Sequence, residues 1–285
     1  MMTLKAALDE ATASIGRVDA QVLVAHLLGV NSAYLVANPM RVLTESEDAR
    51  VDLFVAQRAL GQPVAYLLGK REFYSRDFEV GPEVLIPRPE TETLVEAALD
   101  FLRRPGGRSA TAGRGPISIL DLGTGSGAIA VTLACELPEA RIVATDVSDA
   151  ALATAAANAG AHGCESRIEF IRSAWYEALE GRRFDLIVSN PPYIAARDPH
   201  LAAGDLRFEP AMALTDGSAD GLDSIRAIAS GAPAHLNPGG RLLLEHGYDQ
   251  HSAVAGVLSR AELVDLASIP DLAGIPRVAG GTLDR

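Results

Sequence analysis

The second half of the chain alternates short apolar runs with segments of helical periodicity, and this alternation restricts the fold more than any other feature. The apolar runs predict strands at residues 117–122, 141–146, 168–172, 184–189 and 240–245. Helical patterns lie near residues 127–137, 149–160, 221–235 and 247–260. Such alternation is typical of a mostly parallel sheet with helices on both faces. Sheets of this kind bind ligands beyond the carboxyl ends of their strands.

A glycine-rich turn, Gly123 to Gly127, joins the first of these strands to the helix that follows it. Glycines in such a turn let a ligand come close to the backbone. Asp146 ends the next strand, nineteen residues after Gly127, where a carboxylate can accept hydrogen bonds from ribose hydroxyls. Two alternatives remain open. Asp146 could instead cap the helix that starts near Ser148, and Gly123 to Ala128 also fits the GxGxx(G/A) pattern of nicotinamide-dependent oxidoreductases.

The tetrapeptide Asn190-Pro191-Pro192-Tyr193 follows the strand predicted at residues 184–189. Two successive prolines fix φ and remove two backbone donors, and Pro191 pushes Asn190 out of the α region. The Asn190 side chain and the Pro191 carbonyl are then both available as acceptors, with the Tyr193 ring beside them. This arrangement suits the binding of a planar NH₂ group. The alternative is a rigid loop that only closes the strand.

Residues 1 to about 75 show helical periodicity, beginning with the apolar stripe of Leu4, Ala7 and Ala11. Thr44-Glu-Ser-Glu47 has the pattern of a capping box that opens a further helix. This segment carries seven basic and eight acidic side chains, so it is not a basic surface that binds nucleic acid. Its apolar stripes predict a small core of its own, and docking of another protein is the alternative.

A connector joins the helical segment to the alternating region. Residues 72–80 predict a strand or hairpin arm, and Pro89 has the position of a proline in the first turn of a helix. Residues 103–116 are rich in glycine, proline, serine and arginine, which predicts a flexible surface loop.

The composition narrows the class of protein. A net charge of −12 disfavours the binding of nucleic-acid phosphates, and a hydrophobic content of 48% supports a sizeable core. Cys135 and Cys164 lack the spacing of a metal or redox site, so neither a metal nor a disulfide is predicted. Because neither a signal-peptide pattern nor a membrane-spanning run is apparent, we expect a soluble cytoplasmic protein.

The motifs resemble a known family. Asp121-Leu-Gly-Thr-Gly-Ser-Gly127 with Asn190-Pro-Pro-Tyr193 is similar to the class I S-adenosylmethionine-dependent methyltransferases that act on amide or exocyclic amino nitrogens. Further segments resemble one group within that class, the glutamine N5-methyltransferases of peptide chain release factors. These segments are Val18-Asp-Ala20, Leu27-Leu-Gly29, Gly61-Gln-Pro-Val-Ala-Tyr66, Leu85-Ile-Pro-Arg-Pro-Glu90, Phe208-Glu-Pro210, Leu243-Leu-Glu-His-Gly247 and Ala273-Gly-Ile-Pro-Arg-Val278. The resemblance extends from about Asp19 to about Leu283.

The resemblance implies an α/β fold in three parts. A helical substrate-docking domain would occupy residues 1–71, a β-hairpin linker residues 72–89, and a seven-stranded, Rossmann-like class I methyltransferase domain residues 90–285. It implies S-adenosylmethionine as the cofactor and no metal. The residues implied to contact the cofactor are Gly123, Thr124, Gly125, Ser126, Gly127, Asp146, Trp175 and Asn190.

The implied substrate is the glutamine of the Gly-Gly-Gln loop of class I peptide chain release factors. Asn190, Pro191 and Tyr193 would act in catalysis, and these three with Pro192 would bind the glutamine. The resemblance leads us to expect a monomer whose partner is the release factor, without direct contact to nucleic acid. Three functions remain as alternatives: a glutamine methyltransferase of a ribosomal protein, an adenine-N6 methyltransferase of nucleic acid, and a non-catalytic module that binds S-adenosylmethionine.

Other residues have two interpretations. Trp175 would stack on adenine, with Ser173 supporting the adenine edge, or Trp175 would only pack in the core. Arg88 and Glu90 would orient the linker or the substrate loop, or form surface salt bridges. Glu245 and His246 follow a strand end and would line the crevice, and His246 is expected to be structural rather than a base. Phe73 and Tyr74 would flank the substrate glutamine or anchor the hairpin.

Overall fold

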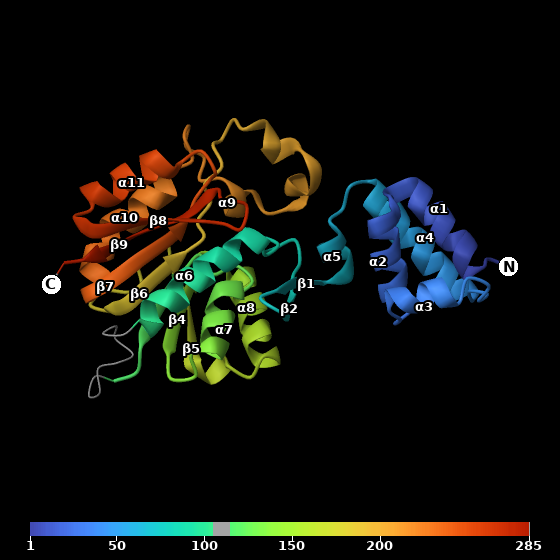
Figure 1. Ribbon diagram of the computed structural model, residues 1–285, viewed down its shortest axis with the longest axis horizontal. Coiled ribbons are helices and arrows are strands. Elements are labelled where there is room, and N and C mark those ends of the chain that lie inside the picture. The colour runs from blue at the N-terminus through green and yellow to red at the C-terminus, as the bar shows by residue number, and fades with distance from the viewer. Residues whose placement is uncertain (105–114, 285) are drawn as a thin grey trace. The chain divides into compact units, whose positions relative to one another are not determined.

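The structure, a computed structural model, describes residues 1–104 and 115–284 (Figure 1). The chain forms two compact units. One contains Met1–Lys70 and Ala203–Phe208, and the other contains Arg71–Ala202 and Glu209–Arg285. Most of the loop predicted at residues 103–116 lies outside the described residues. No helix in the described part of the chain is long and apolar enough to cross a membrane.

The first unit is helical and has a core of its own. Its helices are α1 (Leu4–Ile15), α2 (Arg17–Leu27), α3 (Ser32–Ala37), α4 (Glu45–Ala59) and α5 (Val64–Leu68). Leu4, Val24 and Leu35 are among the residues buried between them. The predicted capping box is confirmed at the start of α4, where the side chains of Thr44 and Glu47 each accept from the other residue's backbone N–H.

The hexapeptide Ala203–Phe208 belongs to the helical unit although it comes from far along the chain. Arg58 on α4 donates to Asp19 on α2 and to Asp205 on the hexapeptide, with nitrogen–oxygen distances of 2.7 and 2.9 Å. One guanidinium thus bridges two carboxylates that lie far apart in the sequence. The sequence patterns gave no indication of this connection.

The second unit is built on a sheet that has seven strands within the described residues, in the order β5-β4-β3-β6-β7-β9-β8. The strands are β3 (Ser118–Leu122), β4 (Arg141–Asp146), β5 (Ile168–Arg172), β6 (Phe184–Ser189), β7 (Leu236–Glu245), β8 (Leu263–Pro270) and β9 (Pro276–Leu283). Strands β3 to β7 run parallel to one another, and β9 is antiparallel to both β7 and β8. The predicted α/β fold is confirmed.

The pattern of apolar residues did not predict β8 and β9. Most side chains of β8 are exposed or half-buried, so the strand shows little hydrophobic alternation. The neighbouring β9 contains Gly280 and Gly281, which weaken a strand signal. Gly280 is needed there, because a Cβ atom would lie 2.5 Å from the side chain of Leu243 and 2.6 Å from the carbonyl oxygen of Leu242.

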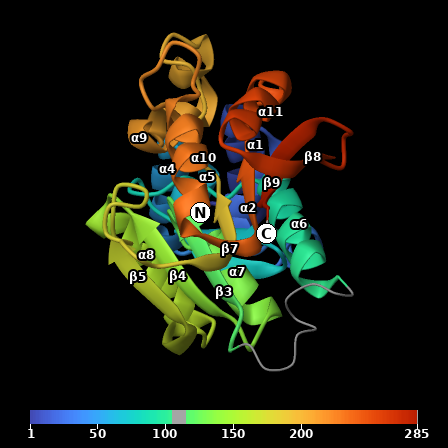
Figure 2. The same cartoon turned by 90° about the vertical axis from the view of Figure 1, so that its left-hand side faces the viewer.

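Helices cover both faces of the sheet, as predicted. One face packs against α6 (Glu92–Arg103), α7 (Ala128–Glu136) and α8 (Asp149–Ala161). The other packs against α10 (Asp223–His235) and α11 (His251–Arg260), which Figure 2 shows on the opposite side of the strands from α7. Shorter helical turns are η1 (Pro89–Thr91), η3 (Glu165–Arg167), η4 (Pro199–Ala202), η5 (Gly204–Phe208) and α9 (Ala211–Leu214).

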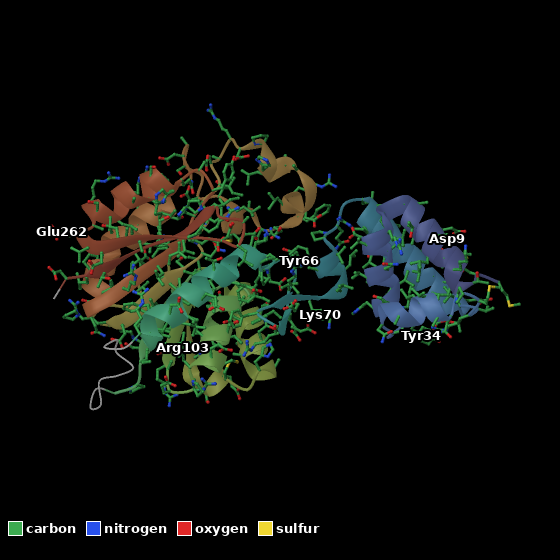
Figure 3. The ribbon with its side chains drawn as sticks, viewed as in Figure 1. Asp9, Tyr34, Tyr66, Lys70, Arg103 and Glu262 are labelled. Carbon is green, nitrogen blue, oxygen red and sulfur yellow. The ribbon has the colours of Figure 1, made fainter. Side chains whose placement is uncertain are left out.

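A two-stranded hairpin precedes this unit's first long helix. Its strands are β1 (Lys70–Phe73) and β2 (Arg76–Glu79), and Lys70 is labelled in Figure 3. Phe73 and Phe78 are fully buried and pack edge to face, with ring centroids 6.0 Å apart. The hairpin is thereby attached to the core of the sheet unit.

Candidate active site

A cavity opens at the carboxyl ends of β3, β4 and β6, where the topology of a parallel sheet places a ligand site. It contains about 1000 Å³ of empty space, counting the part that is open to solvent. The lining residues include two groups that come from different parts of the fold. The glycine-loop wall comprises residues 123–126, Asp146, Ser173 and Trp175, and the asparagine wall comprises Thr91, Asn190 and Pro192.

The glycine loop is shaped by backbone hydrogen bonds. Gly123 N and Thr124 N both donate to the carbonyl oxygen of Thr145, at 2.9 and 2.8 Å. Gly123 and Gly125 have φ of +72° and +54°, values that glycine adopts with little strain. A Cβ atom on Gly125 would meet nothing within 4 Å, so the loop leaves open space at this position.

Gly127 has a different place from the rest of the loop. It is buried, it is the N-cap residue of α7, and it is not among the residues that line the cavity. A Cβ atom there would lie 3.0 Å from the Cβ of Ala155 on α8. Its φ of +80° also favours glycine. The geometry therefore gives Gly127 a role in helix packing, whereas the resemblance had implied contact with the cofactor.

Asp146 presents its carboxylate to the cavity. Its Oδ2 accepts from Gly125 N and its Oδ1 from Ser148 N, each at 3.0 Å. The alternative role, as cap of α8, is taken by Ser148, whose hydroxyl oxygen accepts from Ala151 N. Each Asp146 oxygen can accept further hydrogen bonds, so the carboxylate remains able to bind the hydroxyls of a ribose.

Trp175 lines the same wall in a strained backbone conformation, with φ of +50°. A non-glycine residue in this region costs about 1 kcal/mol or more, and such strain concentrates at functional sites. Ser173 holds the turn: its hydroxyl donates to the Trp175 carbonyl and accepts from Ala178 N, both at 3.0 Å. The backbone N–H of Ser173 is bound in turn to the Asp146 carbonyl.

Beneath the glycine loop lies Asp121, a residue that the sequence patterns singled out only as part of the motif. It is fully buried, and the hydroxyl of Thr124 donates to its Oδ2 at 2.7 Å. Burial raises the pKa of this carboxyl to about 7, although the hydrogen bond from Thr124 opposes the shift. Asp121 therefore fixes the base of the loop from below and does not line the cavity.

Asn190 is half-buried at the asparagine wall. Its Nδ2 donates to Thr91 Oγ1 at 3.2 Å. Within residues 1–104 and 115–284, no donor is bound to its Oδ1. The amide nitrogen is thus tied to the protein, and the amide oxygen is left as an acceptor.

The other residues of the tetrapeptide lie in different environments. Pro192 lines the cavity, whereas Pro191 is buried and Tyr193 packs against the core on the α10 side of the sheet. The Tyr193 hydroxyl donates to Glu245 Oε1 at 3.1 Å, and its carbonyl accepts from Gln250 Nε2 at 2.9 Å. The Tyr193 ring is therefore not a lining residue of the cavity, although the sequence had suggested a flat wall there.

A buried ion pair supports the part of the cavity wall that comes from residues 83–88. The guanidinium of Arg88 binds the carboxylate of Glu209, whose other oxygen accepts from Ile86 N at 3.0 Å. The Glu209 side chain is completely buried. Arg88 thus pairs with an interior carboxylate rather than with a surface partner. Only the tripeptide Phe208-Glu-Pro210 had pointed to Glu209, through the resemblance.

Phe73 and Tyr74 do not line the cavity, and the geometry supports their role as anchors of the hairpin. Phe73 is buried against Phe78, and the Tyr74 hydroxyl donates to Glu96 on α6 at 2.6 Å. Cys164 is buried in the core of the sheet unit.

His246 also lies outside the cavity. It is fully buried, its Nδ1 lies 2.8 Å from the Gly247 carbonyl oxygen, and burial lowers its pKa. These features suit a structural role. Among the described residues, no group of three or more histidine, cysteine or acidic side chains could hold a metal ion.

The seven-stranded sheet, with a glycine loop after β3 and an acidic residue at the end of β4, is the fold of a class I S-adenosylmethionine-dependent methyltransferase, as two comparisons show. The family model of the methyltransferase small domain matches residues 114–217. A methyltransferase from Pyrococcus furiosus has the same fold, with a TM-score of 0.54 and 18% identity over 81% of this chain and 98% of that one.

The relatives identify the family within this class. The model of the PrmC N-terminal domain matches residues 2–69. A release factor glutamine methyltransferase of Xylella fastidiosa is 52% identical over 93% of this chain and 92% of that protein. One from Bordetella pertussis is 48% identical over 94% of this chain and 95% of that protein. The chain belongs to the release factor glutamine methyltransferase family, and not to the nicotinamide-dependent oxidoreductases.

The cavity residues fit the cofactor of this class, S-adenosylmethionine. The Asp146 carboxylate has free lone pairs for two ribose hydroxyls, and the half-buried Trp175 offers an aromatic surface of the kind on which adenine stacks. The open space at Gly125 admits a ligand close to the backbone.

Proposed function

We propose that this protein methylates the side-chain amide nitrogen, N5, of the glutamine in the Gly-Gly-Gln loop of a class I peptide chain release factor. The observation that carries the proposal is the orientation of the Asn190 amide. Because Nδ2 is bound to Thr91, Oδ1 is the atom left to accept a hydrogen bond from a substrate NH₂ group. The names of the relatives support a release factor as the substrate.

The glycine-loop wall would hold the cofactor through Gly123, Thr124, Gly125, Ser126, Asp146 and Trp175. When bound, S-adenosylmethionine supplies an electrophilic methyl group on its sulfonium sulfur. The residues of the chain therefore have to prepare the nucleophile rather than activate the methyl group.

An amide nitrogen is a poor nucleophile because its lone pair is delocalised into the carbonyl group. In our proposal, Asn190 Oδ1 and the Pro191 carbonyl accept the two N–H bonds of the glutamine, and Pro192 lines its site. Tyr193 would support the tetrapeptide from the core through its hydrogen bond to Glu245. These acceptors orient the nitrogen and favour the positive charge that develops on it. Positioning of reactants can supply up to roughly 7–11 kcal/mol, and one preorganised polar contact about 3 kcal/mol. A general base is not required before the transfer, and water can take the proton afterwards.

The test is transfer of labelled methyl from S-adenosylmethionine to a purified class I release factor, with the modified residue located by peptide mass spectrometry. The matched control is the same factor with the loop glutamine changed to alanine. We expect label on that glutamine and none in the control. Label on a ribosomal protein or on adenine in nucleic acid, and none on the release factor, would overturn the proposal.

We further propose that the protein acts in the cytoplasm as a monomer and binds the release factor without contacting nucleic acid. The net charge of −12 supports the last point, since phosphate binding depends on clustered basic charge. Methyl transfer to the isolated release factor at an undiminished rate after nuclease treatment would be the expected result. A requirement for ribosomes or RNA would contradict it.

A further inference from the structure

Glu245 is a buried carboxyl group at the carboxyl end of β7 that the proposed reaction has not used. Its exposure is 1%, and it does not line the cavity. The Tyr193 hydroxyl donates to Oε1 at 3.1 Å. Its other oxygen, Oε2, is buried and has no hydrogen-bond partner within the described residues. A buried carboxylate oxygen without a donor is costly, so this atom calls for an explanation.

Thr91 supplies a donor that lies near this carboxyl group. The Asn190 side-chain nitrogen can only donate, so Thr91 Oγ1 must accept in their 3.2 Å hydrogen bond. The proton of the Thr91 hydroxyl is then available to another acceptor. Thr91 lies close enough to Glu245 to lower the pKa of that carboxyl. Donation from the Thr91 hydroxyl to Glu245 Oε2 would give each of these two groups the hydrogen-bond partner that it needs.

The position of Thr91 supports a role outside helix formation. Thr91 precedes α6 at the N-cap, where a threonine hydroxyl commonly accepts from a backbone N–H of the first turn. Here the side chain makes no capping hydrogen bond. It is buried to 4% exposure and directed instead to Asn190, which lies 99 residues further along the chain. Removal of the hydroxyl would therefore leave the helix cap unchanged.

We propose that Glu245 is a positioning residue that acts through Thr91 to hold the Asn190 amide with its oxygen, and not its nitrogen, towards the substrate. The two ends of an amide have nearly the same shape, so only hydrogen bonds select between them. In the selected orientation, donation runs from Asn190 to Thr91 and from Thr91 to Glu245. A rotated amide would present a donor to the NH₂ group of the substrate and could not bind it. This inference rests on the proposed function, because it explains how the acceptor is selected.

The electrostatic surroundings of Glu245 are mixed. Burial, the largest influence, raises the pKa of Glu245 and favours its neutral form, and Glu90 acts in the same direction. Hydrogen bonds from Thr91 and Tyr193 and the charge of Arg277 on β9 favour the ionised form. In its ionised form Glu245 has only acceptor sites, and both neighbouring hydroxyls then donate to it. This property makes Glu245 a suitable end point for a chain of donors.

The first experiment measures turnover with the release factor in three variants. We expect Thr91→Val to lower kcat about 10- to 100-fold, with the KM for the release factor and the affinity for S-adenosylmethionine changed less than threefold. Thr91→Ser, the matched control that keeps the hydroxyl, should retain kcat within about threefold. Glu245→Gln should follow Thr91→Val. Trp175 is the one tryptophan of the chain, so its fluorescence reports cofactor binding in each variant.

A double variant separates positioning from general damage. If Thr91 acts through Asn190, then Thr91→Val combined with Asn190→Ala should be no slower than Asn190→Ala alone. Losses that multiply would overturn the proposal. So would a wild-type kcat in Thr91→Val.

A second readout does not depend on the substrate. In protein labelled with ¹⁵N-asparagine, the side-chain NH₂ signals of Asn190 are assigned by their loss in Asn190→Asp. We expect slow hydrogen exchange of one Nδ2 proton in the wild type, and faster exchange with a changed chemical shift in Thr91→Val and Glu245→Gln. Unchanged signals in both variants would overturn the positioning role. Absence of label on the release factor with these signals as expected would instead overturn the proposed substrate alone.

Discussion

The two walls of the cavity are held in place in different ways. The glycine loop depends mainly on backbone N–H groups, which bind the end of the neighbouring strand β4, as Gly123 and Thr124 bind Thr145. The asparagine wall depends on side chains that are distant in sequence, since Asn190 binds a residue 99 positions away and Tyr193 one 52 positions away. A wall held by backbone should tolerate many side-chain changes but not an added Cβ atom. A wall held by side chains should lose its function in turnover when a single side-chain group is removed.

The largest expected effect tests the asparagine wall. Asn190→Ala removes the acceptor for the substrate NH₂ group, and we expect turnover to fall 100-fold or more, which corresponds to about 3 kcal/mol. The affinity for S-adenosylmethionine should change less than threefold. Single-turnover methyl transfer and Trp175 fluorescence measure the two quantities. Asn38→Ala, which removes a side-chain amide bound to the Tyr34 carbonyl on α3, is the matched control and should behave as wild type. Near-normal turnover of Asn190→Ala would contradict the role of this wall.

The second effect concerns the dependence of stability on pH. Burial raises the pKa of Glu245 from 4.5 to about 7, against hydrogen bonds from Thr91 and Tyr193. A raised carboxyl pKa in the folded state means that its contribution to stability is complete below pH 4.5. That contribution is lost as the pH rises to about 7. Its full size is of the order of 3 kcal/mol.

Urea unfolding at pH 5 and pH 7.5 measures this contribution. We expect the wild type to lose more stability than Glu245→Gln over this interval, because glutamine does not ionise. Asp121, whose pKa is also raised, contributes with the same sign in both proteins and cancels in the comparison. Parallel pH profiles of the two proteins would show that Glu245 is not the group responsible.

The third effect tests the glycine-loop wall through its one carboxylate. Asp146→Ala should raise the dissociation constant for S-adenosylmethionine about 10- to 100-fold, since hydrogen bonds to a charged group contribute about 1.5–3 kcal/mol. Turnover at saturating cofactor should change less than the affinity. Asp149→Ala is the control, because its ion pair with Arg172 is exposed and such pairs contribute little. Equal affinities of the two variants would remove Asp146 from the cofactor site.

The smallest effect separates packing from backbone strain at Gly127, the residue that follows this wall at the start of α7. Gly127→Ala forces a side chain against Ala155 at 3.0 Å, and Gly163→Ala, at a similar positive φ, meets nothing within 4 Å. Both variants should lose about 1–2 kcal/mol from the left-handed conformation. We expect Gly127→Ala to lose about 1 kcal/mol more, as overpacking does. Chemical denaturation measures the difference, and equal losses would show that α7 and α8 do not require the glycine.

The sequence predicted those features whose cause is local. Strands β3 to β6 are short apolar runs, and the glycine loop and Asp146 follow strand ends, so both were apparent from spacing. The partnership of Thr91 with Asn190 was not, because it arises only when the sheet brings α6 beside the end of β6. The burial of Glu209 could not be predicted from the sequence pattern either, because a buried glutamate differs from an exposed one only once its partner, Arg88, is located. Strand β9 was missed because its glycines serve close packing, and packing leaves no periodic signal.

The hexapeptide Ala203–Phe208 has a consequence for how this protein can be divided. It belongs to the helical unit, so the chain passes between the two units three times, after residues 70, 202 and 208. A cut near residue 70, where the PrmC N-terminal domain ends at residue 69, would deprive Asp205 of its bridge through Arg58. The helical unit is therefore discontinuous in sequence. A transfer of the helical unit to another catalytic domain would have to include both Met1–Lys70 and Ala203–Phe208.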